Sequence, residues 1–160
     1  MLAASCSSGP KLSHVLRANG VSLRYPSGWF ATSHALTPVT SPVQVLAVAS
    51  YRLPRNNRGA DGCAPKEALD RLPPEGAFIF GWEFDMPSPS GLRPRDFPRR
   101  PSRFRLTTRT DTECLGRSYE LRFRQSGRFF QIHVKLGSRA GDGTRATALR
   151  ILDSFRPERR

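Results

Sequence analysis

Two runs of alternating apolar and polar residues flank the dipeptide Ser126-Gly127, and they constrain the fold more than any other feature of the chain. A two-residue turn at this dipeptide joins the runs into an antiparallel hairpin. The expected cross-strand pairs are Phe123 with Phe130, Leu121 with Ile132 and Tyr119 with Val134 on one face, and Glu120 with His133 and Arg122 with Gln131 on the other. Pattern and turn length therefore agree on one register.

Further apolar patterns predict the remaining elements. Strands are expected at 20–25, 43–53, 77–84 and 103–108, and helices at 64–72 and 144–155. Segment 43–53 is apolar on both faces, which predicts a central strand, and a short extra strand is allowed near Trp29. The expected fold class is α+β: an antiparallel sheet of about six strands, a short helix after the second strand, and a C-terminal amphipathic helix packed on the sheet.

The length of 160 residues suits a single domain. We expect this domain to cover residues 19–157 and residues 1–18 to form a signal-peptide remnant and tether. Residues 86–102 contain five prolines and no apolar periodicity. They are therefore expected to form a long irregular loop, rich in Pro and Arg, that does not join the sheet.

The residues before and after Cys6 resemble the lipobox of bacterial lipoproteins, because small, weakly apolar residues lead up to the cysteine and Ser and Gly follow it. This resemblance implies a lipid on Cys6 and a place outside the cytoplasm, either membrane-anchored or secreted. The segment before Cys6 lacks the cationic and long apolar parts of a signal peptide, so the hypothesis includes a start further upstream. The alternative is a frayed tail with a free thiol in a cytoplasmic protein.

Two other cysteines, Cys63 and Cys114, lie within the expected domain. They form either one disulfide, which requires an oxidising compartment, or two separate buried thiols. No CxxC pair is present, which argues against a zinc site. We expect no metal and no cofactor.

The formal net charge is +13, and only three of the 26 basic residues are lysine. Such an arginine bias favours GC-rich codon usage over selection for a polyanion, since a phosphate contact needs only a point charge. The densest basic segment contains Arg93, Arg95, Arg99, Arg100, Arg103, Arg105 and Arg109. It is interpreted as a solvated loop or, alternatively, as a site for anionic lipid or wall polymer. No nucleic-acid-binding motif accompanies it, so nucleic acid is disfavoured.

Catalytic signals are weak. His133 faces Glu120 across the predicted hairpin, as a base and its orienting carboxylate would, but a cross-strand polar pair explains the same pattern. Glu83 and Asp85 share one face of a predicted strand and are expected to be ordinary outward acids rather than a catalytic or metal-binding pair. No phosphate-binding loop and no Gly-x-Ser-x-Gly motif occur. We therefore assign no catalytic residue and expect no enzyme.

The pattern Val21-x-Leu23-x-Tyr25-Pro26-x-Gly28-Trp29, together with Ile151-Leu152-Asp153-Ser154-Phe155 near the C-terminus, resembles the PsbP/Mog1 superfamily. The resemblance covers about residues 19–157 and implies an α/β sandwich of the kind found in small lipoproteins or secreted proteins of high-GC Gram-positive bacteria. Members serve as photosystem subunits, as a GTPase partner and as surface lipoproteins. The expected function is thus a non-enzymatic surface domain that binds a protein partner or stabilises a complex, with polyanion binding by residues 93–109 as the alternative.

Overall fold

The computed structural model describes residues 9–58, 60 and 62–159. Along the chain the elements are β1 (His14–Ala18), β2 (Val21–Tyr25), β3 (Phe30–Thr32), β4 (Val43–Ala49), α1 (Lys66–Asp70), β5 (Ala77–Phe84), the 3-10 helix η1 (Pro94–Asp96), β6 (Arg109–Thr112), β7 (Gly116–Gln125), β8 (Arg128–Leu136), α2 (Asp142–Asp153) and β9 (Arg156–Pro157). Among these, no helix is long and apolar enough to cross a membrane.

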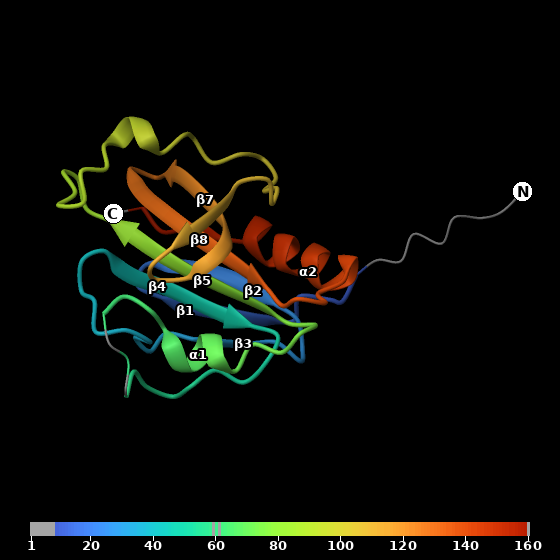
Figure 1. Ribbon diagram of the computed structural model, residues 1–160. Coiled ribbons are helices and arrows are strands. Elements are labelled where there is room, and N and C mark those ends of the chain that lie inside the picture. Colours follow the sequence, from blue (N-terminus) through green and yellow to red (C-terminus); the bar gives the residue numbers. More distant parts are fainter. Residues whose placement is uncertain (1–8, 59, 61, 160) are drawn as a thin grey trace, which may run out of the picture.

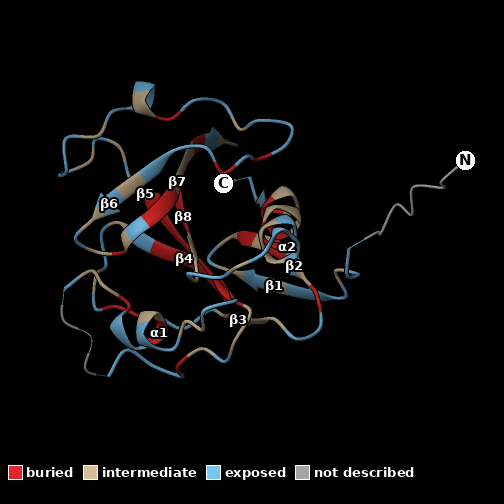
Figure 2. Ribbon diagram, turned by 45° about the vertical axis from the view of Figure 1, so that its right-hand side comes forward, coloured by how far each residue is buried: buried red, intermediate tan, exposed pale blue. Residues whose placement is uncertain are grey.

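The strands form two antiparallel sheets. The larger sheet has the order β3-β4-β5-β8-β7-β6, and the smaller one has the order β1-β2-β9 (Figure 1). The β1–β2 hairpin and α2 lie on one side of the larger sheet, and α1 lies on the other, as Figure 2 shows after the turn of the view. The expected α+β class is confirmed.

The face of the large sheet that α2 covers holds the main core. Phe123 of β7, Phe130 of β8 and Phe155 just after α2 are fully buried, with ring centroids 5.0–5.6 Å apart. Ile151 and Leu152 of α2 pack into the same cluster. Because side chains alternate along a strand, the apolar half of the β7–β8 hairpin supplies this face and its polar half supplies the other.

The opposite face holds a second cluster, built on the aromatic residues of β5. Phe78, Phe80 and Trp82 follow one another along the strand, with ring centroids 5.7 and 4.8 Å apart. Phe97 from the proline-rich segment is fully buried and packs beside Phe84 at 5.8 Å. Both faces of β5 are therefore covered, which explains why every residue of this strand is buried.

A buried ion pair connects the two layers. The Arg128 guanidinium donates from Nε and Nη2 to the Glu83 carboxylate at 2.8 and 2.6 Å, and its side chain is 3% exposed. The same guanidinium donates to the backbone carbonyls of Asn19 and Gly20 in the β1–β2 turn. Hydrogen bonding to Glu83 raises the pKa of Arg128. The expectation that Glu83 points outward with Asp85 is wrong for Glu83, since this long-range pairing compensates its burial.

The register expected for the β7–β8 hairpin is confirmed in all five of its pairs. Ser126 and Gly127 have φ angles of 55° and 72°, the left-handed conformation that a tight hairpin turn requires at both positions. The expected strand 77–84 coincides with β5, and strand 43–53 ends earlier, at Ala49.

Residues 103–108 do not form the expected strand. Side chains from α2 satisfy their backbone instead: Asp153 accepts a hydrogen bond from the Phe104 amide at 2.8 Å, and Arg145 donates to the Leu106 carbonyl at 2.9 Å. Phe104 and Leu106 are still buried, as their alternation indicates. β6 begins at Arg109, and the Thr108 carbonyl just before it already accepts from the Glu120 amide of β7 at 2.9 Å.

The N-terminal boundary and the strand count also differ from expectation. Residues His14–Ala18, expected to belong to the tether, form β1 and pair with β2 over five positions. The described residues contain nine strands rather than about six, because β1, the short β3 and the two-residue β9 add to the count. The first helix consequently follows the fourth strand and not the second. Polar residues obscure the alternation of β1, in which only Leu16 and Ala18 are partly buried.

Cys63 and Cys114 form a disulfide, with their Cα atoms 5.0 Å apart. The bond joins the segment between β4 and α1 to the turn between β6 and β7. Of the two alternatives for these cysteines, the bridge is therefore the one observed, and it fits a protein exported from the cytoplasm.

Loss of this disulfide is expected to lower the free energy of unfolding. For a sequence separation of 51 residues, the loop-entropy model gives about 4 kcal/mol. Urea denaturation of Cys63→Ser/Cys114→Ser beside the oxidised wild type measures the difference. The intact mass of the wild type should rise by about 2 Da on reduction, as expected for a single bridge; an unchanged mass contradicts the bond.

Replacement of Arg128 is expected to destabilise the fold far more than loss of a surface ion pair. Arg128→Met removes the guanidinium from the buried Glu83 carboxylate, which costs about 3–5 kcal/mol. Lys66→Met is the control, since Lys66 and Asp70 are paired but 68% and 62% exposed, and it should cost less than about 1 kcal/mol. Equal losses in urea denaturation would show that the Arg128 pair does not join the layers.

Candidate functional site

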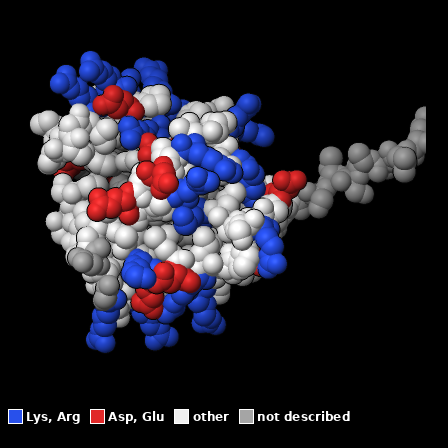
Figure 3. Space-filling view, in the orientation of Figure 1, with Lys and Arg blue, Asp and Glu red and all other residues white. Residues whose placement is uncertain are grey.

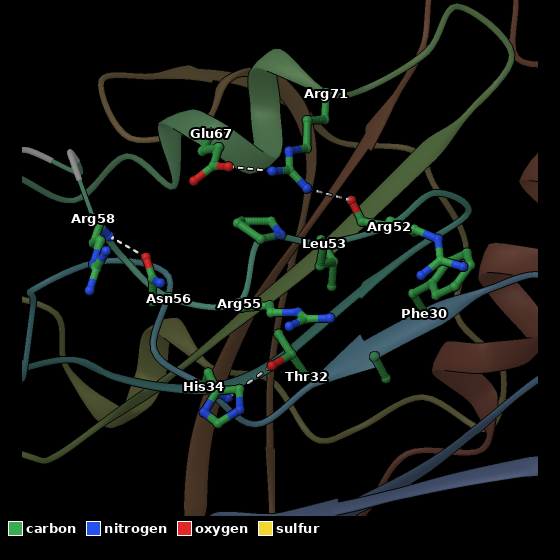
Figure 4. Close-up of a pocket in the computed structure, with 12 residues that line it drawn as sticks. Phe30, Thr32, His34, Arg52, Leu53, Arg55, Asn56, Arg58, Glu67 and Arg71 are labelled. Carbon is green, nitrogen blue, oxygen red and sulfur yellow. Dashed lines mark hydrogen bonds and ion pairs between the residues drawn. The ribbon is translucent and has the colours of Figure 1, made fainter.

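A cavity of about 630 Å³ lies between β3, the segment that follows β4, and α1. Figure 4 shows this cavity with its labelled side chains. Its lining is strongly basic and comprises Phe30, Ala31, Thr32, His34, Arg52, Leu53, Pro54, Arg55, Asn56, Arg58, Glu67 and Arg71. Among the described residues, four arginines thus border this cavity with a single carboxylate, that of Glu67.

Local packing fixes the walls of this cavity. Tyr51 packs beside Phe78 in the second core cluster, and its hydroxyl donates to the Ala68 carbonyl of α1 at 2.6 Å. Burial raises the pKa of Tyr51, so the hydroxyl stays protonated as the donor. Pro54 is buried, which anchors the segment after β4 beneath the exposed Arg52 and Arg55. The walls therefore belong to the packed fold although the arginine side chains reach solvent.

The four arginines around the cavity differ in their contacts with the rest of the protein. Arg71 pairs with Glu67 one turn earlier in α1 and donates to the Arg52 carbonyl at 3.5 Å, and Arg52 lies 5.5 Å over the Phe30 ring. Among the described residues, the side chains of Arg55 and Arg58 have no hydrogen-bond or ion-pair partner. In Figure 4, Arg55 lies between α1 and Thr32, whereas Arg58 lies at the edge of the view.

Such an arrangement is suited to binding an anion. A guanidinium group presents several N–H donors in a plane and pairs with phosphate or carboxylate through two parallel hydrogen bonds. One carboxylate neutralises only part of the charge of the four arginines around the cavity. A bound anion would supply the missing negative charge, and nothing in this geometry requires a catalytic step.

The seven arginines singled out by the sequence do not meet at one place. Arg93 and Arg95 flank Pro94 at η1, and Arg99 and Arg100 lie with Arg124 at a shallow cavity of about 730 Å³. Arg103 and Arg105 line a neighbouring cavity with Arg99, and Arg109 lies in β6. Figure 3 accordingly shows basic side chains in separate groups, over the segment after β5 at the top and beside α1 at the bottom.

Two of these arginines have structural contacts. Arg100 donates to the Asp153 carbonyl at 2.9 Å, and burial lowers its pKa. Arg109 donates to the Tyr119 hydroxyl at 2.8 Å, and Arg109 and Arg145 both lie 4.9 Å from the Tyr119 ring. The hydrogen bond from Arg109 lowers the pKa of Tyr119. The side chains of Arg100 and Arg109 therefore make contacts that stabilise the fold, and they do not lie along one extended loop.

His133 lies opposite Glu120 as expected, but the two do not form a base and its orienting group. The His133 ring uses Nδ1 to hydrogen-bond Ser118 Oγ at 3.0 Å, and Glu120 pairs with Arg122 at 2.7 Å. Burial lowers the pKa of His133. In the described part of the chain, no three His, Cys, Asp or Glu side chains gather as a metal site requires. Cys6, the expected site of lipid attachment, lies outside the described residues.

None of the candidate sites predicted from the sequence lies at this cavity. Arg52, Arg55 and Arg58 recur at intervals of three, and this spacing is the one signal available in the sequence. It is weak in an arginine-rich chain. Arg71 joins them only because Tyr51 holds α1 against the preceding segment.

Comparison with known proteins adds no assignment. The chain matches no protein-family model. It also matches no curated protein. Its function must therefore be inferred from its own geometry.

Proposed function

We propose that this protein is a non-enzymatic binding domain that works outside the cytoplasm and holds a phosphate-bearing anionic ligand in the cavity between β3 and α1. The observation that carries the proposal is the convergence of Arg52, Arg55, Arg58 and Arg71 on one cavity whose described lining contains one carboxylate. The sequence predicts a surface binding domain with an unidentified partner, and the proposal specifies that this partner is an anion. It also moves the polyanion site from residues 93–109 to this cavity.

The contacts of the arginines suggest separate roles in binding. Arg71 is oriented by Glu67, and Arg52 is held over Phe30, so these two guanidinium groups are positioned before a ligand arrives. Arg55 and Arg58 have no such partners among the described residues and would close on the ligand. Bidentate hydrogen bonds from guanidinium groups favour a phosphate over a neutral sugar or peptide group.

The disulfide between Cys63 and Cys114 supports a place in an oxidising compartment. Our proposal includes the lipid on Cys6 and the relationship to the PsbP/Mog1 superfamily that the sequence resemblances imply. A lipid anchor would hold the domain at a membrane surface, where the phosphates of anionic lipids or of wall polymers are concentrated. Attachment and ligand would then act together, since each strengthens the effect of the other at the same surface.

Replacement of Arg55 and Arg58 is expected to abolish most of the anion binding. Wild-type protein should bind inorganic pyrophosphate in a calorimetric titration at low salt. Arg55→Gln/Arg58→Gln should bind it at least about tenfold more weakly, because each charge-assisted hydrogen bond contributes about 1.5–3 kcal/mol. Both residues are exposed, so the melting temperature should stay close to that of the wild type.

The matched control is Arg103→Gln/Arg105→Gln, which removes the same charge from exposed residues of the segment singled out by the sequence. It should bind pyrophosphate as the wild type does. If the control loses binding and the cavity variant keeps it, the arginine-rich segment is the site and the proposal is wrong. Equal weakening of both variants would reduce the effect to net charge, which also refutes a built site.

A further inference from the structure

A second cavity, of about 360 Å³, lies over the face of the large sheet that is opposite to α2. Its floor consists of side chains from four adjacent strands, β5, β8, β7 and β6. Val39, Pro42 and Leu92 from two connecting segments border it, together with the disulfide between Cys63 and Cys114. The cavity shares no lining residue with the arginine-lined cavity.

Three side chains form a row across the floor of this second cavity. The register places Trp82 of β5 opposite Gln131 of β8, and Gln131 opposite Arg122 of β7. Directly opposed residues on one face have Cβ atoms about 4.5–5.5 Å apart, so the indole, the amide and the guanidinium are neighbours. His133 lies two residues further along β8 and lines the same cavity.

Three polar groups on this floor have no hydrogen-bond partner in the described part of the chain, although their residues are largely buried. Gln131 is 8% exposed, Trp82 is 4% exposed and His133 is 3% exposed. Within the described residues, neither the Gln131 amide nor the Trp82 Nε1 makes a hydrogen bond, and His133 bonds only through Nδ1, which leaves Nε2 free. None of these atoms is sealed from solvent, because the described buried side-chain atoms that lack a hydrogen-bond partner belong to Thr37, Arg100, Thr110, Arg122 and Gln125. Each of the three groups therefore opens into the cavity and can meet a ligand there.

Gln44 is a buried glutamine whose amide oxygen and nitrogen are both hydrogen-bonded within the protein, and it provides a comparison for Gln131. Gln44 is 7% exposed, nearly the same as Gln131. Its Oε1 accepts from the Leu36 amide at 2.7 Å, and its Nε2 donates to the His34 carbonyl at 2.8 Å. Both halves of that amide therefore stabilise the neighbouring segment. The Gln131 amide makes no such hydrogen bond among the described residues and lines the cavity, so both of its polar atoms are available to a ligand.

The chemistry of the lining defines that partner. Among the described lining residues, Arg122 is the only charged one. Its Nε lies 2.7 Å from the Glu120 carboxylate as an ion pair but without hydrogen-bond geometry, and its two terminal nitrogens have no partner in the described part of the chain. Arginine and tryptophan donate only, and the Gln131 amide offers two further donors, so the floor is matched to an acceptor group of negative charge. Phe84, Leu92 and the other apolar residues around it favour an apolar body.

We propose that this cavity binds a small apolar carboxylate, with its carboxylate at Arg122 and Gln131 and its apolar body between Trp82, Phe84 and Leu92. The volume lies near the lower end of small-molecule sites, which span roughly 300–1,000 Å³. The site is independent of the arginine-lined cavity and does not require an anion to be bound there.

Calorimetric titration with decanoate tests the ligand class, and decanol serves as the uncharged probe of equal chain length. Decanoate should bind the wild type, and decanol should bind at least about tenfold more weakly for want of the charge-assisted hydrogen bonds. Pyrophosphate should not displace decanoate, because the two probes occupy separate cavities. Failure of decanoate to bind, equal binding of decanol, or displacement by pyrophosphate would each overturn the proposal.

A pair of glutamine variants separates a ligand-binding amide from a structural one. Gln131→Leu should weaken decanoate binding at least about tenfold, yet leave the ligand-free melting temperature close to that of the wild type, since the amide makes no hydrogen bond within the described part of the chain. Gln44→Leu should instead lower the melting temperature, since it removes two hydrogen bonds that hold the segment between β3 and β4. A loss of stability in Gln131→Leu as large as that in Gln44→Leu would assign Gln131 to the fold and refute the proposal.

Discussion

The ion pair between Arg128 and Glu83 is the contact on which the arrangement of the two sheets depends. Glu83 lies near the end of β5 and Arg128 begins β8, so their pairing joins adjacent strands of the large sheet. The guanidinium also binds the carbonyls of the β1–β2 turn, where Gly20 has a φ of 65° and a Cβ would lie 3.1 Å from Arg128 Nη1. Glu158, after β9, donates its amide to the Gly20 carbonyl as well. One buried charge pair therefore fixes where the small sheet meets the large one.

This contact and α2 fix one face of the large sheet. Both candidate binding sites lie on the other side of the sheet or at its edge. Apart from the short α1, connecting segments cover this other side, and the disulfide joins one of them to the turn between β6 and β7. Covers of this kind leave cavities because irregular segments do not pack against a sheet as closely as a helix does. Both candidate sites depend on these segments: the arginine-lined cavity forms around 52–58 and α1, and the second cavity forms beneath Val39, Pro42 and Leu92.

The sequence predicts those elements whose structure is determined by residues close to one another in the chain. The register of the β7–β8 hairpin follows from a two-residue turn and from alternation within 20 residues of it, and β5 follows from its aromatic alternation. Partners distant in sequence could not be anticipated: Asp153 and Arg145 replace the strand partner of residues 103–108, and Arg128 lies 45 residues from Glu83. The arginine-lined cavity falls in the same class, because Arg71 reaches Arg52 only through the docking of α1.

Arginine is so common in this chain that its number says little, and the structure distinguishes the arginines by their partners. Arg128, Arg100 and Arg109 each donate to a carboxylate, a carbonyl or a hydroxyl elsewhere in the fold, so their guanidinium groups already have hydrogen-bond partners. The side chains of Arg55 and Arg58 have no hydrogen-bond or ion-pair partner among the described residues. The same distinction separates Gln44 from Gln131, two buried glutamines of nearly equal exposure. A polar group that lines a cavity and has no partner in the fold can hydrogen-bond a ligand without first breaking a contact within the protein, and both proposed sites use groups of this kind.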